Sequence, residues 1–216
     1  MIFFNIFFSH LLASGSVDET VLLWDMKEGK VGRTIKGHQE KIQSLCWHPF
    51  ESQMLLTGCC DEKARVYDCN QESFKSWKVD GEVEKVLWNH FNPYTFLVAT
   101  EKGMVHMVDV RQDGKSLWKL SAHSEGINGM ALSTQCPDCL VTGSSDKTMK
   151  VWDIANNKPT CILEKDLKIG RVHSLDNCPD APFVFAFGGD VPSNTMTVTD
   201  IREATSGKEF YNLCRY

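Results

Sequence analysis

Short runs of apolar and β-branched residues recur along the whole chain, separated by polar turns. Two of them, Ile42–Trp47 and Val83–Trp88, alternate in part between apolar and polar positions, which is typical of a strand with one buried face. Other runs are nearly continuous and follow Gly, Ser, Asp, Glu or Lys turns: Val21–Trp24, Ala64–Tyr67, Met104–Val108 and Met149–Trp152. Because no window of a dozen residues repeats with the helical period, the pattern predicts an all-β chain.

Aspartates end these runs at nearly constant intervals of 43, 41, 44 and 47 residues: Asp25, Asp68, Asp109, Asp153 and Asp200. Such spacing falls in the period of roughly 40 to 45 residues of a four-stranded propeller blade. His38 and His123 each precede a closing aspartate by 30 residues, and each precedes a second aspartate, Asp61 or Asp146, by 23 residues. Agreement at both ends of two units indicates that the chain is an array of one repeated unit.

The motifs inside the units resemble those of the WD-repeat family. Its signature is a Gly-His dipeptide, a Ser/Thr-Gly-Ser-x-Asp turn and a terminal Trp-Asp. The matching segments are Ser14–Asp18 with Leu23–Asp25, Gly37-His38 with Thr57–Asp61 and Val66–Asp68, and His123 with Thr142–Asp146 and Val151–Asp153. The resemblance covers nearly the whole chain after about residue 11. It implies an all-β WD-repeat β-propeller with about four and a half blades present, as part of a seven-bladed ring.

The repeats suggest seven segments. These are an atypical apolar N-terminus at 1–10, a partial repeat at 11–25, repeats at 26–68 and 110–153, degenerate repeats at 69–109 and 154–201, and a tail at 202–216. The Phe-rich residues 1–10 either replace a blade strand or come from an alternative start. Because the number of blades is short of a ring, we expect the chain to be the C-terminal portion of a longer propeller.

Repeated polar residues in an apolar blade need partners, since burying them unpaired costs several kcal/mol. In the WD-repeat family a His, a Ser/Thr, the turn Asp and the terminal Trp form a hydrogen-bonded network. By position the network members here are Ser14, Asp18 and Trp24; His38, Thr57, Asp61 and Tyr67; and His123, Thr142, Asp146 and Trp152. The Tyr67 hydroxyl is expected to donate in place of an indole N–H. Since Val98, Lys102 and Val108 replace the polar positions of the third unit, apolar packing is expected to hold it.

Catalytic and metal chemistry is disfavoured. A nucleophile is needed once, whereas the Ser/Thr, His and Asp set recurs and lacks a Gly-x-Ser-x-Gly elbow. Cys136 and Cys139 have the spacing of half a zinc site, but no second pair of ligands accompanies them. Gly188–Asp190 lacks the Lys-Ser/Thr and helix of a nucleotide-binding loop. We therefore expect no enzyme, cofactor, metal or small-molecule substrate.

Composition agrees with a protein that binds other proteins. The chain is 42% hydrophobic and 24% charged with a net charge of −5, so direct nucleic-acid binding is unlikely as its main activity. Nine cysteines without a secretory leader favour a reducing compartment inside the cell. No apolar stretch approaches the roughly 20 residues of a membrane span.

Several segments are similar to the C-terminal half of the periodic tryptophan protein one family: Trp47–Glu51, Trp88–Pro93, Leu140–Gly143 with Asp146-Lys147, and Cys178–Phe183 leading to Phe185–Gly189. This resemblance implies a nuclear and nucleolar scaffold linked to chromatin, ribosomal RNA transcription and ribosome assembly, with proteins as partners. WD propellers commonly meet peptides on a rim, which implies contact positions at Val17, Cys60 and Ser145.

Two other functions stay open. The Asp-x-Arg endings of two units, Asp109 with Arg111 and Asp200 with Arg202, resemble WD proteins that bind the adaptor of cullin ubiquitin ligases. That resemblance implies a substrate receptor of a cullin-RING ligase. A propeller enzyme would instead need converging carboxylates or histidines on the channel rim, and the sequence offers no such additional set.

Overall fold

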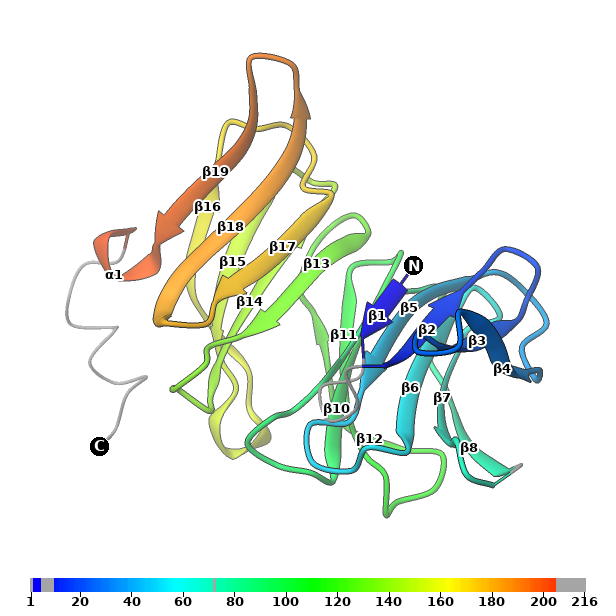
Figure 1. Cartoon of the computed structure of the whole chain (residues 1–216). Helices are drawn as coiled ribbons and strands as arrows, with labels where there is room; N and C mark the ends of the chain where they lie inside the picture. The colour runs from blue at the N-terminus through cyan, green and yellow to red at the C-terminus, as the bar shows by residue number, and fades with distance from the viewer. Residues whose placement is uncertain (1, 5–9, 72, 205–216) are drawn as a thin grey trace. The chain divides into compact units, whose positions relative to one another are not determined.

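The chain folds into five consecutive antiparallel sheets, in a computed structural model that describes residues 2–4, 10–71 and 73–204 (Figure 1). The first sheet holds β1 (Ile2–Phe4), β2 (Leu11–Gly15), β3 (Val21–Asp25) and β4 (Lys30–Ile35). The second holds β5 (Ile42–Trp47), β6 (Met54–Cys59), β7 (Lys63–Asp68) and β8 (Ser73–Lys78). The third holds β9 (Val83–Trp88), β10 (Thr95–Thr100), β11 (Met104–Asp109) and β12 (Ser116–Ser121).

The remaining two sheets complete the described chain. The fourth holds β13 (Ile127–Leu132), β14 (Cys139–Ser144), β15 (Thr148–Asp153) and β16 (Thr160–Asp166), with the short 3₁₀ turn η1 (Ala155–Asn157) before β16. The fifth holds β17 (Ser174–Cys178), β18 (Ala181–Val191) and β19 (Asn194–Asp200), followed by α1 (Ile201–Ala204). The predicted all-β fold, built of successive small antiparallel sheets like propeller blades, is confirmed. Within the described residues, no helix is long and apolar enough to cross a membrane.

The chain divides into two compact units, residues 1–101 with 105–119, and residues 102–104 with 120–216. The first unit contains almost all of the first three sheets, and the second contains the fourth and fifth sheets. Each unit has its own apolar core between neighbouring sheets.

The sheets cross the boundaries of the sequence repeats. The outermost strands β4, β8, β12 and β16 each follow a closing aspartate, so the first strand of one repeat completes the sheet of the repeat before it. At the other edge of the first sheet, β1 pairs antiparallel with β2, with Ile2 opposite Ser14. Residues 2–4 thus form an edge strand of the first sheet, which agrees with one of the two expectations for residues 1–10, and the origin of this segment stays a prediction. Residues 1, 5–9 and 205–216, including most of the predicted tail, lie outside the described residues.

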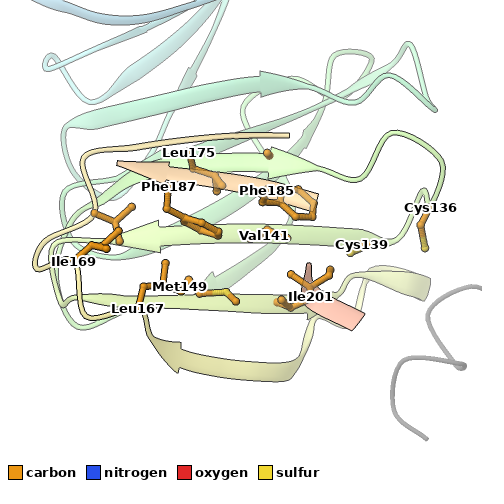
Figure 2. Close-up of a cluster of buried hydrophobic side chains, with 13 residues drawn as sticks. Cys136, Cys139, Val141, Met149, Leu167, Ile169, Leu175, Phe185, Phe187 and Ile201 are labelled. Carbon is orange, nitrogen blue, oxygen red and sulfur yellow. The ribbon is translucent and has the colours of Figure 1, made fainter. Parts of the chain in front are cut away.

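Burial differs sharply between strand positions. The second strands β10 and β14 are buried at every residue, whereas β4, β8 and β16 are mostly exposed. A strand whose side chains are buried on both faces needs apolar residues at successive positions, which explains the continuous runs in the sequence. Figure 2 shows this packing in the second unit, where Phe185 and Phe187 of β18 lie near Val141 of β14 in one buried cluster.

Close packing also explains the glycine of the Ser/Thr-Gly motif. A Cβ added at Gly58 would lie 2.4 Å from a methyl carbon of Val83 in the next sheet. At Gly143 it would lie 2.6 Å from a methyl carbon of Val172. Because Val83 of the next sheet and Val172 of the loop before β17 occupy the space of a side chain, a residue larger than glycine would force these neighbours to move.

Candidate functional site: polar networks and surface positions

The most complete polar network lies in the fourth sheet. His123 precedes β13; its Nε2 lies 2.7 Å from Thr142 Oγ1 and its Nδ1 lies 2.9 Å from Asp146 Oδ2. The indole N–H of Trp152 donates to the same Thr142 hydroxyl oxygen over 2.9 Å. Burial lowers the pKa of His123, so its imidazole is neutral near pH 7. Four side chains from a loop, two strands and a hairpin turn therefore satisfy one another.

Asp146 also fixes the hairpin turn between β14 and β15. Its Oδ1 accepts hydrogen bonds from the Thr148 N–H and hydroxyl, over 3.0 and 2.7 Å. Burial opposes ionisation of Asp146, but the Thr148 hydrogen bonds and His123 hold the pKa of this carboxyl below its ordinary value. The following residue, Lys147, has a left-handed φ of 73°. The same turn position is left-handed at Glu19, Glu62 and Gly103.

The second sheet has a related network that includes Arg65. His38 Nε2 lies 2.6 Å from Thr57 Oγ1, as in the fourth sheet. The Arg65 guanidinium donates to Asp61 Oδ2 over 2.7 Å and also contacts His38 Nδ1. Burial, followed by the nearby charge of Arg65, lowers the pKa of His38 to about 4. Both members of the Arg65–Asp61 ion pair are buried, with side chains 4% and 5% exposed.

The expectation for the Tyr67 hydroxyl is wrong. This hydroxyl is buried and makes no hydrogen bond within the described part of the chain. A phenol carries its O–H at the far end of the ring, whereas an indole carries its N–H on the side. The Tyr67 oxygen consequently lies beside Gly37, where an added Cβ would be 2.9 Å away. Arg65, rather than Tyr67, supplies the additional donor to this network.

The first sheet contains part of the predicted set. The Trp24 indole N–H donates to Ser14 Oγ over 2.8 Å, which joins β3 to β2. Asp18 is exposed, and its Oδ1 accepts from the Thr20 N–H and hydroxyl over 3.0 and 2.7 Å. Asp18 thus orders its own turn, while Ser14 and Trp24 bond across the strands.

The third sheet is packed by apolar side chains at the predicted positions, since Phe96, Val98 and Val108 are fully buried in one cluster. It also holds a polar residue that the sequence analysis missed. His106 is fully buried on β11, with Nδ1 3.2 Å from the Ser116 hydroxyl. Burial lowers its pKa to about 4. A signal was present, because His106 lies three residues before Asp109, as Arg65 does before Asp68.

One group of possible metal ligands was also missed. The ligand atoms of His38, Cys59 and Asp61 lie within 4.8 Å of one another. The Arg65 guanidinium already contacts two of these side chains, and its charge would repel a divalent cation. We therefore assign no metal here. Cys136 and Cys139 are both buried in the cluster of Figure 2, as small core residues.

The three predicted rim residues differ in exposure. Val17 is 79% exposed, whereas Cys60 is buried. Burial, with Glu82 nearby, raises the pKa of the Cys60 thiol to about 12, so it stays protonated. Ser145 is half-buried, and its hydroxyl oxygen accepts from the Asn128 amide over 2.9 Å. Contact of these residues with a partner stays a prediction.

The Asp-x-Arg endings form the same local arrangement in two sheets. Arg111 donates through Nε to Asp109 Oδ1 over 2.9 Å, and Arg202 donates to Asp200 Oδ1 over the same distance. Each guanidinium also lies near an aromatic ring, at 4.3 Å from that of Tyr94 for Arg111 and at 5.5 Å from that of Phe183 for Arg202. The arginine side chains are nevertheless 60% and 57% exposed, so each leaves much of its surface open to solvent.

Polar residues at the ends of the inner strands connect neighbouring sheets and were not predicted. His48 follows β5, and its Nε2 lies 2.9 Å from the carbonyl oxygen of Pro93, in the turn between β9 and β10 of the third sheet. Ser133 follows β13 and donates to the Pro182 carbonyl in the fifth sheet over 2.7 Å. Both residues directly follow the first strand of their sheet, and this shared position was the sequence signal that could have revealed the contacts.

Comparison with known proteins agrees with this geometry. The family of the WD domain, G-beta repeat, matches residues 6–25, 29–68 and 114–153. The chain is 43% identical over 193 residues to the Periodic tryptophan protein 1 homolog of Drosophila melanogaster, covering 87% of this chain and 42% of that protein. It is 33% identical over 194 residues to Periodic tryptophan protein 1 of Saccharomyces cerevisiae, covering 82% of this chain and 33% of that protein.

The chain thus spans less than half the length of these two relatives. The matched repeats contain the hydrogen bonds from Trp24 to Ser14 and from Trp152 to Thr142, so the sequence signature and the bonded network coincide. The chain belongs to the WD-repeat family and is similar over most of its length to periodic tryptophan protein 1.

Proposed function

We propose that this chain is a non-enzymatic scaffold that binds other proteins in ribosome biogenesis. The observation that carries the proposal is the 43% identity over 193 residues to the Drosophila periodic tryptophan protein 1 homolog. From the same resemblance we propose a nuclear and nucleolar location, with roles in ribosomal RNA transcription and chromatin association. Propellers suit such work because their rigid sheets position loops and edges that hold several partners.

The polar networks support a scaffold over an enzyme. The Thr142 hydroxyl is completely buried between His123 and Trp152, and Thr57 is equally buried beside His38. A hydroxyl that is buried and already bonded to neighbouring side chains is poorly placed to attack a substrate. The Thr, His and Asp side chains that resemble a catalytic triad therefore have a structural role in each of two sheets.

The test is affinity purification of the tagged chain from cells, followed by mass spectrometry, with and without ribonuclease. We expect ribosome-assembly proteins to be recovered in both samples, because the proposed contacts are between proteins. Recovery that disappears with ribonuclease would indicate RNA bridging. Absence of ribosome-assembly proteins in both samples would refute the proposed role.

A second candidate function is that of a substrate receptor of a cullin-RING ubiquitin ligase. It is favoured by the exposed faces of Arg111 and Arg202, which recur beside Asp109 and Asp200. The same purification tests it, since the ligase adaptor should be recovered and then lost with Arg111→Ala or Arg202→Ala. Lys115→Ala, at another exposed cation, is the matched control.

A further inference from the structure

An apolar groove opens between the second and third sheets, inside the first unit. Its cavity volume is about 480 Å³, which is in the range of roughly 300 to 1,000 Å³ found for ligand pockets. Met54, Val66 and Trp77 line it from the second sheet, and Trp88 and Val110 line it from the third. The polar networks of His38 and His123 lie outside this space, whereas His48, Pro93 and Arg111 are part of its lining.

Exposed aromatic side chains gather around the groove. Among the described residues, the large aromatic side chains that are exposed are Phe50, Phe74, Phe91 and Tyr94. Phe74 and Tyr94 line the groove directly. Phe50 and Phe91 lie in the β5–β6 and β9–β10 turns, which contribute other lining residues. A concentration of exposed apolar surface at one place is a mark of an interaction site.

One wall of the groove carries a hydrogen-bond donor without a partner. Trp88 is only 3% exposed, and its indole N–H makes no hydrogen bond within the described residues. Buried donors are normally paired, and an indole can only donate. The indole nitrogen itself is buried, so a ligand in the groove would contact the Trp88 ring rather than this N–H group.

The charges at the groove favour a basic ligand. Lys75 and Arg111 line it, but Lys75 lies 3.6 Å from Asp113 and Arg111 is bonded to Asp109. With these two cations balanced, Glu51 and Asp68 give the rim a negative charge. A lysine or arginine next to the apolar anchor of a ligand would complement these two carboxylates.

We propose that this groove binds an extended peptide segment of a partner protein, with an aliphatic side chain in the cavity and basic residues beside it. The aliphatic side chain packs against the Trp88 ring, and the basic residues meet Glu51 and Asp68. The proposal rests on the scaffold part of the proposed function and is independent of ribosome assembly. A failed purification of assembly proteins would leave it intact.

The experiment titrates the purified chain with capped peptides while recording the NMR signals of its six tryptophan indoles. The Trp88 signal is assigned with the variant Trp88→Phe. The probe is acetyl-Lys-Leu-Lys-amide, with Lys-Gly-Lys lacking the anchor and Glu-Leu-Glu reversing the charge. We expect a saturable shift of the Trp88 indole with the first peptide, and binding weaker by about tenfold for each of the others.

Two charge reversals on exposed residues separate binding from folding. Glu51→Lys should weaken Lys-Leu-Lys binding by about fivefold and favour Glu-Leu-Glu. Glu125→Lys, on an exposed residue of the second unit, is the control and should leave binding within about twofold.

Three results would overturn the proposal. One is the absence of a saturable Trp88 shift up to about 10 mM peptide. Another is equal affinity for the leucine and glycine peptides. The last is a Trp88 shift that depends on protein concentration without peptide, because a second copy of the chain would then occupy the groove.

Discussion

Replacing Thr142 by valine tests whether the polar network stabilises the fourth sheet. Valine keeps the shape of threonine but removes the hydroxyl, so little cavity is created. The Trp152 N–H and the His123 Nε2 then lose a shared partner in a fully buried place. Each unsatisfied group costs about 1–3 kcal/mol, so the free energy of unfolding should fall by about 2–6 kcal/mol for the two groups together. That is a large part of the roughly 5–15 kcal/mol of a typical domain.

The assay is urea unfolding followed by far-ultraviolet circular dichroism, with free energies taken from linear extrapolation. Thr95→Val is the matched control, because Thr95 is also buried but its hydroxyl lies 3.4 Å from the Asn92 carbonyl, at the limit of a hydrogen bond. We expect the control to cost less than about 1 kcal/mol. An unchanged denaturant slope would show that both variants unfold over the same surface.

A double-variant cycle identifies the source of the loss. Trp152→Phe removes the N–H that Thr142→Val leaves unpaired. The double variant should therefore lose less free energy of unfolding than the sum of the losses in the two single variants, by about 1 kcal/mol or more. Our reasoning would be refuted if Thr142→Val cost no more than Thr95→Val, or if the two losses were simply additive.

Other predictions concern buried charge, pH and the contacts between sheets. Arg65→Met should lower the free energy of unfolding by about 3–5 kcal/mol, because the buried Asp61 carboxylate loses the cation that balances its charge. Urea unfolding should show a loss below about 1 kcal/mol for Lys150→Met, whose Glu164 partner is exposed. The folded pKa of His106, about 4, lies below the ordinary 6.5, so the unfolded chain binds the proton first. The contribution of neutral His106 to the free energy of unfolding should be fully present above pH 6.5. It should decrease by about 1.4 kcal/mol per pH unit as the pH falls toward 4. Urea unfolding at a series of pH values should show a smaller slope of the free energy of unfolding against pH in His106→Leu. The slope should be kept in His173→Leu, because His173 is exposed. Equal slopes in both variants would contradict the role given to His106. Ser133→Ala should cost about 1–2 kcal/mol in thermal or urea unfolding, through loss of its bond to the Pro182 carbonyl, whereas a loss no larger than that of the exposed Ser124→Ala would count against it.

Much of the fold was predictable because each repeat contains strong local sequence signals. The closing aspartates and the apolar runs located the strands near their observed positions, as for β7 at Lys63–Asp68 and β15 at Thr148–Asp153. The outer strands were harder to locate. They are mostly exposed, so their residues, as in β8, lack the apolar pattern that reveals buried strands.

The polar interior was predictable only where the motif is complete. His123 and Thr142 lie where the WD signature implies, and their bonds follow from it. The second sheet differs because the position of an O–H on a tyrosine ring cannot be read from residue type, and Arg65 carries no family motif. The groove at Trp88 was also unpredictable, since it depends on how two sheets pack rather than on any run of residues.

The residue three positions before the closing aspartate differs from one repeat to the next, and so do its partners. This position holds Leu22, Arg65, His106 and Lys150 in the first four units. Arg65 is buried against Asp61, His106 is buried and neutral beside Ser116, and Lys150 reaches Glu164 at the surface. The backbone geometry is common to these sheets, but each interior balances its charge with different partners. A substitution that one sheet tolerates at this position therefore leaves a buried group without its partner in another sheet.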